Sequence, residues 1–118
     1  QTVIHSHMCF SEFVDIMHAI VRMGVDVLTI EDSKAGGKAA ASLREAGIPF
    51  SIGLGVYDVH SNRIPNINEI TGIPKRALEI GMSPYQIWIN PDCGLKTRGP
   101  EAWQQLSTMM HGAFYLRQ

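Results

Sequence analysis

Several features that would assign a function by themselves are missing from this sequence. No apolar run approaches the ~20 residues that a helix needs to cross a bilayer, and no basic-then-apolar leader is visible. The 10 Lys and Arg residues are balanced by 11 Asp and Glu residues, giving a net charge of -1, so nothing favours a nucleic acid or an anionic membrane as a partner. The glycine pair at 36–37 fits neither common phosphate-binding pattern. We therefore expect a cytoplasmic protein whose partners are neither membranes nor nucleic acids.

Cysteine is also scarce, since the chain has only Cys9 and Cys93. Two cysteines can be ligands of a zinc ion, the halves of a disulfide, or two unremarkable core thiols, and the residues alone leave all three open. The lack of a signal peptide and the nearby His and Glu side chains favour metal ligation. The chain also lacks a starting Met, which predicts that it is a piece of something longer.

What the sequence does contain is a regular alternation of strand-like and helix-like segments. The 118 residues are 45% hydrophobic and 18% charged, as in one globular domain. Strands are expected at residues 2–8, 25–30, 50–59 and 85–90, each followed by a helical segment. Four consecutive β-α units predict an α/β fold with parallel strands, which is half of a (β/α)8 TIM-type barrel. A half barrel leaves open strand edges, so we expect a missing half barrel or a second copy of the chain to cover them, unless the strands form a flat sandwich.

The helical segments carry more detailed predictions. Ser11 is the expected cap of the first helix, and Gly24 its left-handed end. Gly72 and Pro74 are expected to break the third helix and to leave a main segment at 74–80. The spacing of apolar residues predicts two buried faces. These comprise Phe13, Ile16, Met17, Ile20 and Val21 in the first helix, and Trp103, Leu106, Met110 and Phe114 in the last.

Four side chains that suit a metal ion lie in or just after the expected strands. His7 and Cys9 are two residues apart, so on a strand they face the same way. Glu31 ends the second strand, and Cys93 follows the fourth. The carboxyl ends of parallel strands are where active sites gather in α/β proteins. An imidazole, two thiols and a carboxylate in that place predict a zinc site.

Four blocks of the sequence carry a resemblance to a known family. They read His-Met-Cys-Phe-Ser-Glu-Phe at 7–13, Leu-Thr-Ile-Glu at 28–31, Gly-Leu-Gly-Val-Tyr-Asp-Val-His-Ser at 53–61 and Trp-Ile-Asn-Pro-Asp-Cys-Gly-Leu-Lys-Thr-Arg at 88–98. In this order and at these spacings, the chain resembles the cobalamin-independent methionine synthase family over nearly its whole length. The loop at 34–37 departs from the family pattern, because it lacks an acidic residue common there.

The resemblance implies a fold, a site and a reaction. Residues 1–118 would be the C-terminal half of the zinc-containing catalytic barrel of a larger enzyme. His7, Cys9, Glu31 and Cys93 would hold zinc, and His60 would be the proton donor. The enzyme would be a methyltransferase of methionine biosynthesis that transfers the methyl group of 5-methyltetrahydrofolate, in its polyglutamate form, to the thiol of homocysteine. Apart from the resemblance, Asp58 and Asp92 are both candidates to orient an imidazole, and the residues do not decide between them.

These residues suit that chemistry, and two alternatives stay open. Zinc would lower the pKa of the homocysteine thiol, and an imidazole can protonate a poor nitrogen leaving group near neutral pH. The groups that grip the substrates are expected outside the chain, so we predict little or no turnover from these 118 residues alone. One alternative is a related zinc-thiolate methyltransferase with another methyl donor. The other is a non-catalytic zinc-binding half-barrel module.

Overall fold

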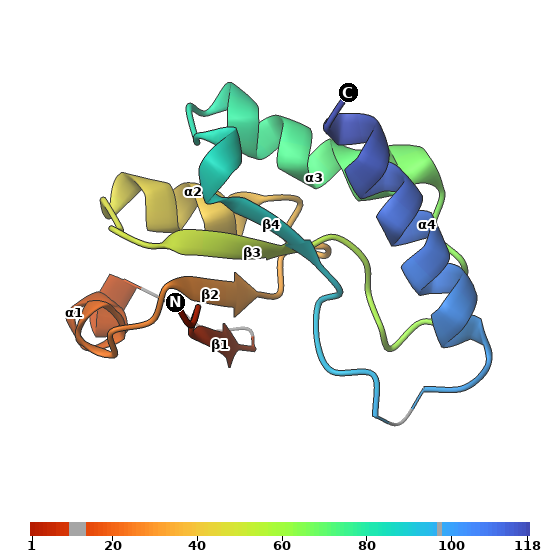
Figure 1. Ribbon diagram of the computed structural model, residues 1–118, viewed down its shortest axis with the longest axis horizontal. Helices are drawn as coiled ribbons and strands as arrows, with labels where there is room; N and C mark the ends of the chain where they lie inside the picture. Colours follow the sequence, from red (N-terminus) through yellow and green to blue (C-terminus); the bar gives the residue numbers. More distant parts are fainter. Residues whose placement is uncertain (10–13, 97) are drawn as a thin grey trace.

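The four expected strands form one parallel sheet. In this computed structural model, which describes residues 1–9, 14–96 and 98–118, the strands follow one another in the order β1-β2-β3-β4. They run His5–Met8 (β1), Val27–Ile30 (β2), Ser51–Gly55 (β3) and Ile87–Asn90 (β4). All neighbouring pairs are parallel, so their carboxyl ends lie at one edge of the sheet (Figure 1).

A helical segment follows each strand, which confirms the prediction of four β-α units. The segments are the 3-10 turn η1 (Val14–Ile16) with α1 (Met17–Arg22), then α2 (Lys38–Glu45), α3 (Ile67–Glu79), the 3-10 turn η2 (Pro84–Gln86) before β4, and α4 (Glu101–Leu116). Helix α4 packs along α3 (Figure 1). Strands in sequence order with a helix after each are the arrangement of half a TIM barrel. No helix in the described part of the chain is long and apolar enough to cross a membrane.

The two faces of the sheet differ in character. One face forms the core, where Leu28, Ile30, Ile52 and Leu54 are fully buried with side chains from the helices. The other face carries the register row His7, Thr29, Gly53 and Trp88. His7 and Trp88 are exposed on this second face, and Thr29 is half-buried. In a closed barrel this face would point inward, and polar residues on it are therefore available to a site.

The prediction that Gly72 and Pro74 break the third helix is wrong. Helix α3 runs without interruption from Ile67 to Glu79, with Pro74 inside it. Its start is fixed by a capping box, in which the Asn66 side chain accepts the Glu69 N–H at 3.0 Å and the Glu69 carboxylate accepts the Asn66 N–H at 3.0 Å. The burial of one side of the helix, Pro74 included, offsets the backbone hydrogen bond that a proline cannot donate.

The predicted buried faces of the first and last helices are also partly wrong. In the first, Ile20 is buried, but Ile16 and Val21 are 39% and 41% exposed; Ser11 and Phe13 lie outside the described residues. Gly24 has the left-handed φ of 69° that was expected just beyond the helix end.

Helix α4 turns a different stripe inward from the one predicted. Gln105, Met109 and Gly112 are buried, whereas Trp103 and Phe114 are 78% and 67% exposed. Met110 is exposed as well, and Leu106 is half-buried. The physical reason is the close packing of Gly112 on α3, because a Cβ there would collide with Ile70. This contact orients the helix and leaves its large apolar side chains outside.

Candidate metal centre

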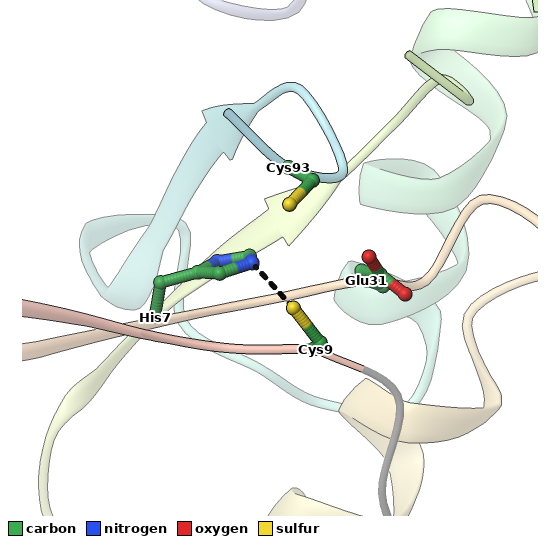
Figure 2. Close-up of side chains that lie close together, drawn as sticks. All are labelled: His7, Cys9, Glu31 and Cys93. Carbon is green, nitrogen blue, oxygen red and sulfur yellow. Dashed lines mark hydrogen bonds between the residues drawn. The ribbon is translucent and has the colours of Figure 1, made fainter. Parts of the chain in front are cut away.

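The four predicted ligands meet at the carboxyl edge of the sheet. His7 lies in β1, Cys9 follows the end of β1, Glu31 follows β2 directly, and Cys93 lies in the loop after β4. Their side chains point toward one another (Figure 2). One ligand atom from each residue lies within 4.8 Å of all the others. Three strands far apart in sequence therefore bring the four side chains to one point.

The group fits a tetrahedral metal ion. With zinc–nitrogen, –oxygen and –sulfur bonds of about 2.0–2.3 Å, ligand atoms in a tetrahedron lie roughly 3.3–3.8 Å apart. A contraction of about 1 Å in the widest spacing would bring these residues to that geometry. No disulfide joins Cys9 to Cys93 among the described residues, so both sulfurs are available as ligands. His7 and Cys9 are exposed while Glu31 and Cys93 are half-buried, which leaves the site open on one side.

Neighbouring groups make the Cys9 thiol harder to deprotonate. The pKa of Cys9 is raised, first by its hydrogen bond with the Cys93 side chain, then by the Cys93 charge, by desolvation and by the charge of Glu31. Each of these groups adds negative charge or an acceptor to the same small space. Such a cluster favours a divalent cation, because a cation would offset the repulsion that disfavours the second thiolate.

The His7 ring is held by the neighbouring strand. Its Nδ1 lies 2.8 Å from the Thr29 hydroxyl oxygen, and that hydroxyl donates a hydrogen bond to the Ser6 carbonyl at 3.1 Å. Its Nε2 lies 3.7 Å from the Cys9 sulfur (Figure 2). The ring thus presents Nε2, and not Nδ1, to the ligand cluster.

Asp92, next to Cys93, holds the loop after β4 to the loop after β2. Its Oδ1 accepts the backbone N–H groups of Asp32 and Ser33, both at 3.2 Å, and its Oδ2 accepts the Ser33 hydroxyl. Asp92 is 4% exposed. Its pKa is raised, chiefly by burial, although the hydrogen bonds from Ser33 oppose the rise. Because Asp32 follows Glu31 directly, this contact fixes the spacing between two of the predicted ligands.

Asp32 continues the same network into α2. Its carboxylate accepts the backbone N–H groups of Ala39 and Ala40, each at 3.0 Å, and so satisfies donors at the start of that helix. Burial raises its pKa, against the effect of these hydrogen bonds. Gly55 makes room for the network, since a side chain there would collide with Asp92 and with the Ile30 carbonyl. The loops that carry Glu31 and Cys93 are therefore anchored to a helix and a strand.

His60 lies apart from the four-ligand group, in the loop after β3. It is exposed, and it lines a cavity of about 390 Å³ together with Glu31, Lys34, Ala35, Asp58 and Asp92. Asp58 accepts the backbone N–H of His60 at 2.9 Å and forms an ion pair with Lys34 at 3.3 Å. Burial acts to raise the pKa of Asp58, but these partners and the His60 charge outweigh it, so that the pKa is lowered. His60 and the predicted ligand Glu31 thus line the same cavity.

Thr29 and Ser33 are not among the residues predicted for the site. Asp58 and Asp92 were the two candidates to orient an imidazole. Asp92 accepts hydrogen bonds from Asp32 and Ser33, and Asp58 accepts the backbone N–H of His60. For Thr29 a signal exists, because it is the one hydroxyl residue in the apolar strand β2 and stands two residues before Glu31. Its contact with His7 follows from the pairing of the two strands, in which His7 and Thr29 are register partners.

Comparison with known proteins places the chain in a family. Residues 1–114 match the family model described as "Cobalamin-independent synthase, Catalytic domain". The chain is similar to the 5-methyltetrahydropteroyltriglutamate--homocysteine methyltransferases of three bacteria. It is 46% identical over 117 residues to that of Neisseria gonorrhoeae (98% of this chain), 46% over 118 residues to that of Coxiella burnetii (99%) and 40% over 116 residues to that of Corynebacterium glutamicum (98%). The chain spans about 15% of the length of each of these relatives. With nearly all of its residues matched, the chain belongs to the cobalamin-independent methionine synthase family and carries part of its catalytic domain.

Proposed function

We propose that residues 1–118 are the C-terminal half of the zinc-containing catalytic barrel of a methionine synthase. The observation that supports this most is the convergence of His7, Cys9, Glu31 and Cys93 within 4.8 Å at the carboxyl edge of the sheet. The reaction would be the transfer of a methyl group from 5-methyltetrahydrofolate, as its polyglutamate, to the thiol of homocysteine. The names of the relatives, which pair a methyltetrahydropteroyltriglutamate with homocysteine, support this choice of substrates.

In this proposal the four residues would hold a zinc ion. Two sulfurs, an imidazole nitrogen and a carboxylate oxygen are a donor set that suits zinc. When bound, zinc would coordinate the homocysteine sulfur and lower its pKa, so that the reactive thiolate is present near neutral pH. Cys9, Cys93 and Glu31 contribute negative charge, which keeps the sulfur electron-rich. Glu31 is the hardest donor of the four, so it would be the most weakly held of the proposed ligands.

His60 would supply the proton. The methyl group leaves from a folate nitrogen, and protonation of that nitrogen makes it a better leaving group. His60 lines the cavity that Glu31 also lines, so an imidazole and a metal ligand face one substrate-sized space. The Asp58 carboxylate accepts the backbone N–H of His60 at 2.9 Å. This hydrogen bond fixes the backbone position from which the imidazole extends. In this proposal an acid and a metal ligand would line the cavity that receives the methyl donor.

The rest of the catalytic barrel would lie outside these residues. The chain spans about 15% of its relatives, and the register row that carries His7 and Trp88 is uncovered. We propose that a further half barrel, or a second copy of the chain, pairs with β1 and β4 and supplies the groups that grip homocysteine and folate. We expect little turnover without it, because binding and orientation are a large part of catalysis.

A methyl-transfer assay on the full-length protein with His60→Gln tests this function. We expect methionine formation from homocysteine and the methyl-folate in the parent protein, and a kcat lower by about 10²–10⁴ in the variant, as for the loss of a general acid. The zinc content should not change. His111→Gln, at an exposed histidine of α4, is the matched control and should retain full activity.

The same assay separates the alternatives. If turnover occurs only with a methylated corrinoid or a small methyl compound, the protein is still a methyltransferase, but the proposed methyl donor is wrong. Zinc binding without turnover with any of these donors would indicate a non-catalytic module. Full activity in His60→Gln would remove His60 from the reaction.

A further inference from the structure

We infer that Thr29 is a positioning residue, which fixes the tautomer of His7 so that Nε2 is the metal-binding nitrogen. The inference deepens the proposed metal site and rests on it. Thr29 is not one of the four proposed metal ligands. It acts through two hydrogen bonds of its hydroxyl group, one to His7 and one to the Ser6 carbonyl. Three observations carry it: the number of protons on the Thr29 hydroxyl, the placement of the ring, and the packing that orients Thr29.

The first observation is a count of protons. A threonine hydroxyl has one hydrogen and two acceptor lone pairs. The Thr29 hydroxyl donates to the Ser6 carbonyl at 3.1 Å, so toward His7 Nδ1, 2.8 Å away, it can only accept. The proton of that contact must therefore belong to Nδ1. In a neutral imidazole the other nitrogen, Nε2, then carries the lone pair.

The second observation is where Nε2 points. It lies 3.7 Å from the Cys9 sulfur, within the cluster of ligand atoms (Figure 2). A metal ion binds the unprotonated nitrogen of a neutral imidazole, so the tautomer required for binding is the one that Thr29 imposes. The hydrogen bonds form one continuous path, from the Cys9 thiol to His7, from His7 to Thr29 and from Thr29 to the Ser6 carbonyl.

The third observation is that Thr29 has little freedom to turn away. It is the register partner of His7 on β2, and its branched Cβ restricts χ1. Its methyl group occupies the space above Gly53 on the next strand, where any Cβ would collide with it. With the methyl group placed over Gly53, the hydroxyl faces Ser6 and His7. Gly53 thereby supports the site although it has no side chain.

Two substitutions separate the hydroxyl from the shape of the side chain. Thr29→Val keeps the branched shape and removes the hydroxyl, whereas Thr29→Ser keeps the hydroxyl. The full chain, labelled with [15N]histidine and free of metal, is studied by long-range 1H–15N NMR at about pH 8.5, where an unperturbed imidazole is neutral. We expect His7 to carry its proton on Nδ1 in the parent and in Thr29→Ser, and to populate both tautomers in Thr29→Val.

Zinc affinity, measured by competition with a chromophoric chelator, is the second readout. We expect Thr29→Val to bind zinc about 10–100-fold more weakly, the usual loss when a partner of a metal-binding histidine is removed. Thr29→Ser should restore most of the affinity. If Thr29→Val fails to fold, as judged by circular dichroism, Thr29→Ala removes the same hydroxyl and carries the same test.

The two readouts keep this inference distinct from the proposed function. An unchanged His7 tautomer and an unchanged zinc affinity in a folded variant without the hydroxyl would overturn the inference. Absence of zinc binding in the parent chain would overturn the metal site itself. In that case the NMR readout alone decides whether Thr29 sets the tautomer, and an unchanged tautomer would still overturn it.

Discussion

At the scale of single residues, the contact between Asp92 and Ser33 decides how far apart Glu31 and Cys93 lie. The buried Asp92 carboxylate accepts three hydrogen bonds from Asp32 and Ser33. Two of the donors are backbone N–H groups, which would lose their partner if the carboxylate were removed. The geometry of the candidate metal centre therefore depends on a residue that is not itself a predicted ligand.

We predict that Asp92→Ala lowers the free energy of unfolding by about 2–3 kcal/mol, because buried donors are left without an acceptor. Urea unfolding followed by circular dichroism measures the change. Asp15→Ala, which removes an exposed carboxylate, is the control, and its unfolding midpoint in urea should equal that of the parent. Equal midpoints for the parent, Asp92→Ala and Asp15→Ala would show that the contact does not stabilise the loops.

The convergence of His7, Cys9, Glu31 and Cys93 could be predicted from sequence, and the contacts around them could not. His7, Cys9 and Glu31 lie in or next to apolar runs that read as strands, and parallel strands end at one edge. By contrast, Asp92 and Ser33 are 59 residues apart. Their contact depends on how loops after β2 and β4 close over Gly55, which no local pattern reports.

At the scale of helices, Gly72 in α3 and Gly112 in α4 differ in whether there is room for a side chain. A Cβ at Gly112 would collide with the Ile70 side chain, whereas at Gly72 it would make only ordinary contact with Arg76. Both glycines lie inside helices, where alanine is intrinsically favoured by about 0.5–1 kcal/mol.

We therefore predict opposite effects for the two glycine substitutions. Gly112→Ala should lower the free energy of unfolding by about 1–3 kcal/mol, since the helices must move apart. Gly72→Ala should raise it by about 0.5–1 kcal/mol. Thermal unfolding of the two variants beside the parent measures both. A stabilising Gly112→Ala would contradict the close packing of α4 on α3.

The capping box of α3 predicts a pH dependence. The pKa of Glu69 is lowered, first by its hydrogen bond with Arg63, with further help from the Asn66 N–H and against desolvation. A carboxyl whose pKa is lower in the folded state stabilises the fold above its unfolded pKa of about 4.5, and this stability is lost as the pH falls through the folded pKa.

Glu69→Gln should therefore be less stable than the parent at pH 7, and the difference should vanish as the pH falls well below about 4.5. We expect an effect under about 1 kcal/mol, because the Arg63–Glu69 pair is largely exposed. Unfolding by urea at several pH values measures it. A gap between the two proteins that persists unchanged in acid would contradict the assigned role of the carboxylate.

The predicted extent of α3 and the predicted buried face of α4 were wrong, because each is determined by contacts that the local spacing of apolar residues does not show. The proline rule predicts a break at Pro74, but the Asn-x-x-Glu capping signal at Asn66 and Glu69 starts the helix at Ile67, well before the proline. In α4 the apolar spacing identified a real stripe. It could not show that this stripe faces away from the described core, because Gly112 turns a different side of the helix inward.

At the scale of the whole molecule, apolar surface lies where a larger assembly would cover it. Trp103 and Phe114 on α4 and Trp88 on β4 are well exposed, and β1 and β4 are the edge strands of the sheet. The fold class followed from alternating segments, which sequence reports well. The partner that covers this surface cannot be predicted from these residues. The alternating strands and helices of a half barrel are the same whether a second half barrel or a second copy of the chain completes it.

The most direct test of the account is the zinc stoichiometry of the purified chain, measured for the parent, Cys93→Ser and His5→Ala. His5 is the matched control, because it lies on the same face of β1 as His7 and contacts Trp88, outside the four-ligand group. We predict one tightly held zinc per chain in the parent and in His5→Ala, and its loss in Cys93→Ser. A parent chain without zinc, or equal zinc in the parent and in Cys93→Ser, would contradict the claim that these four residues form a metal centre.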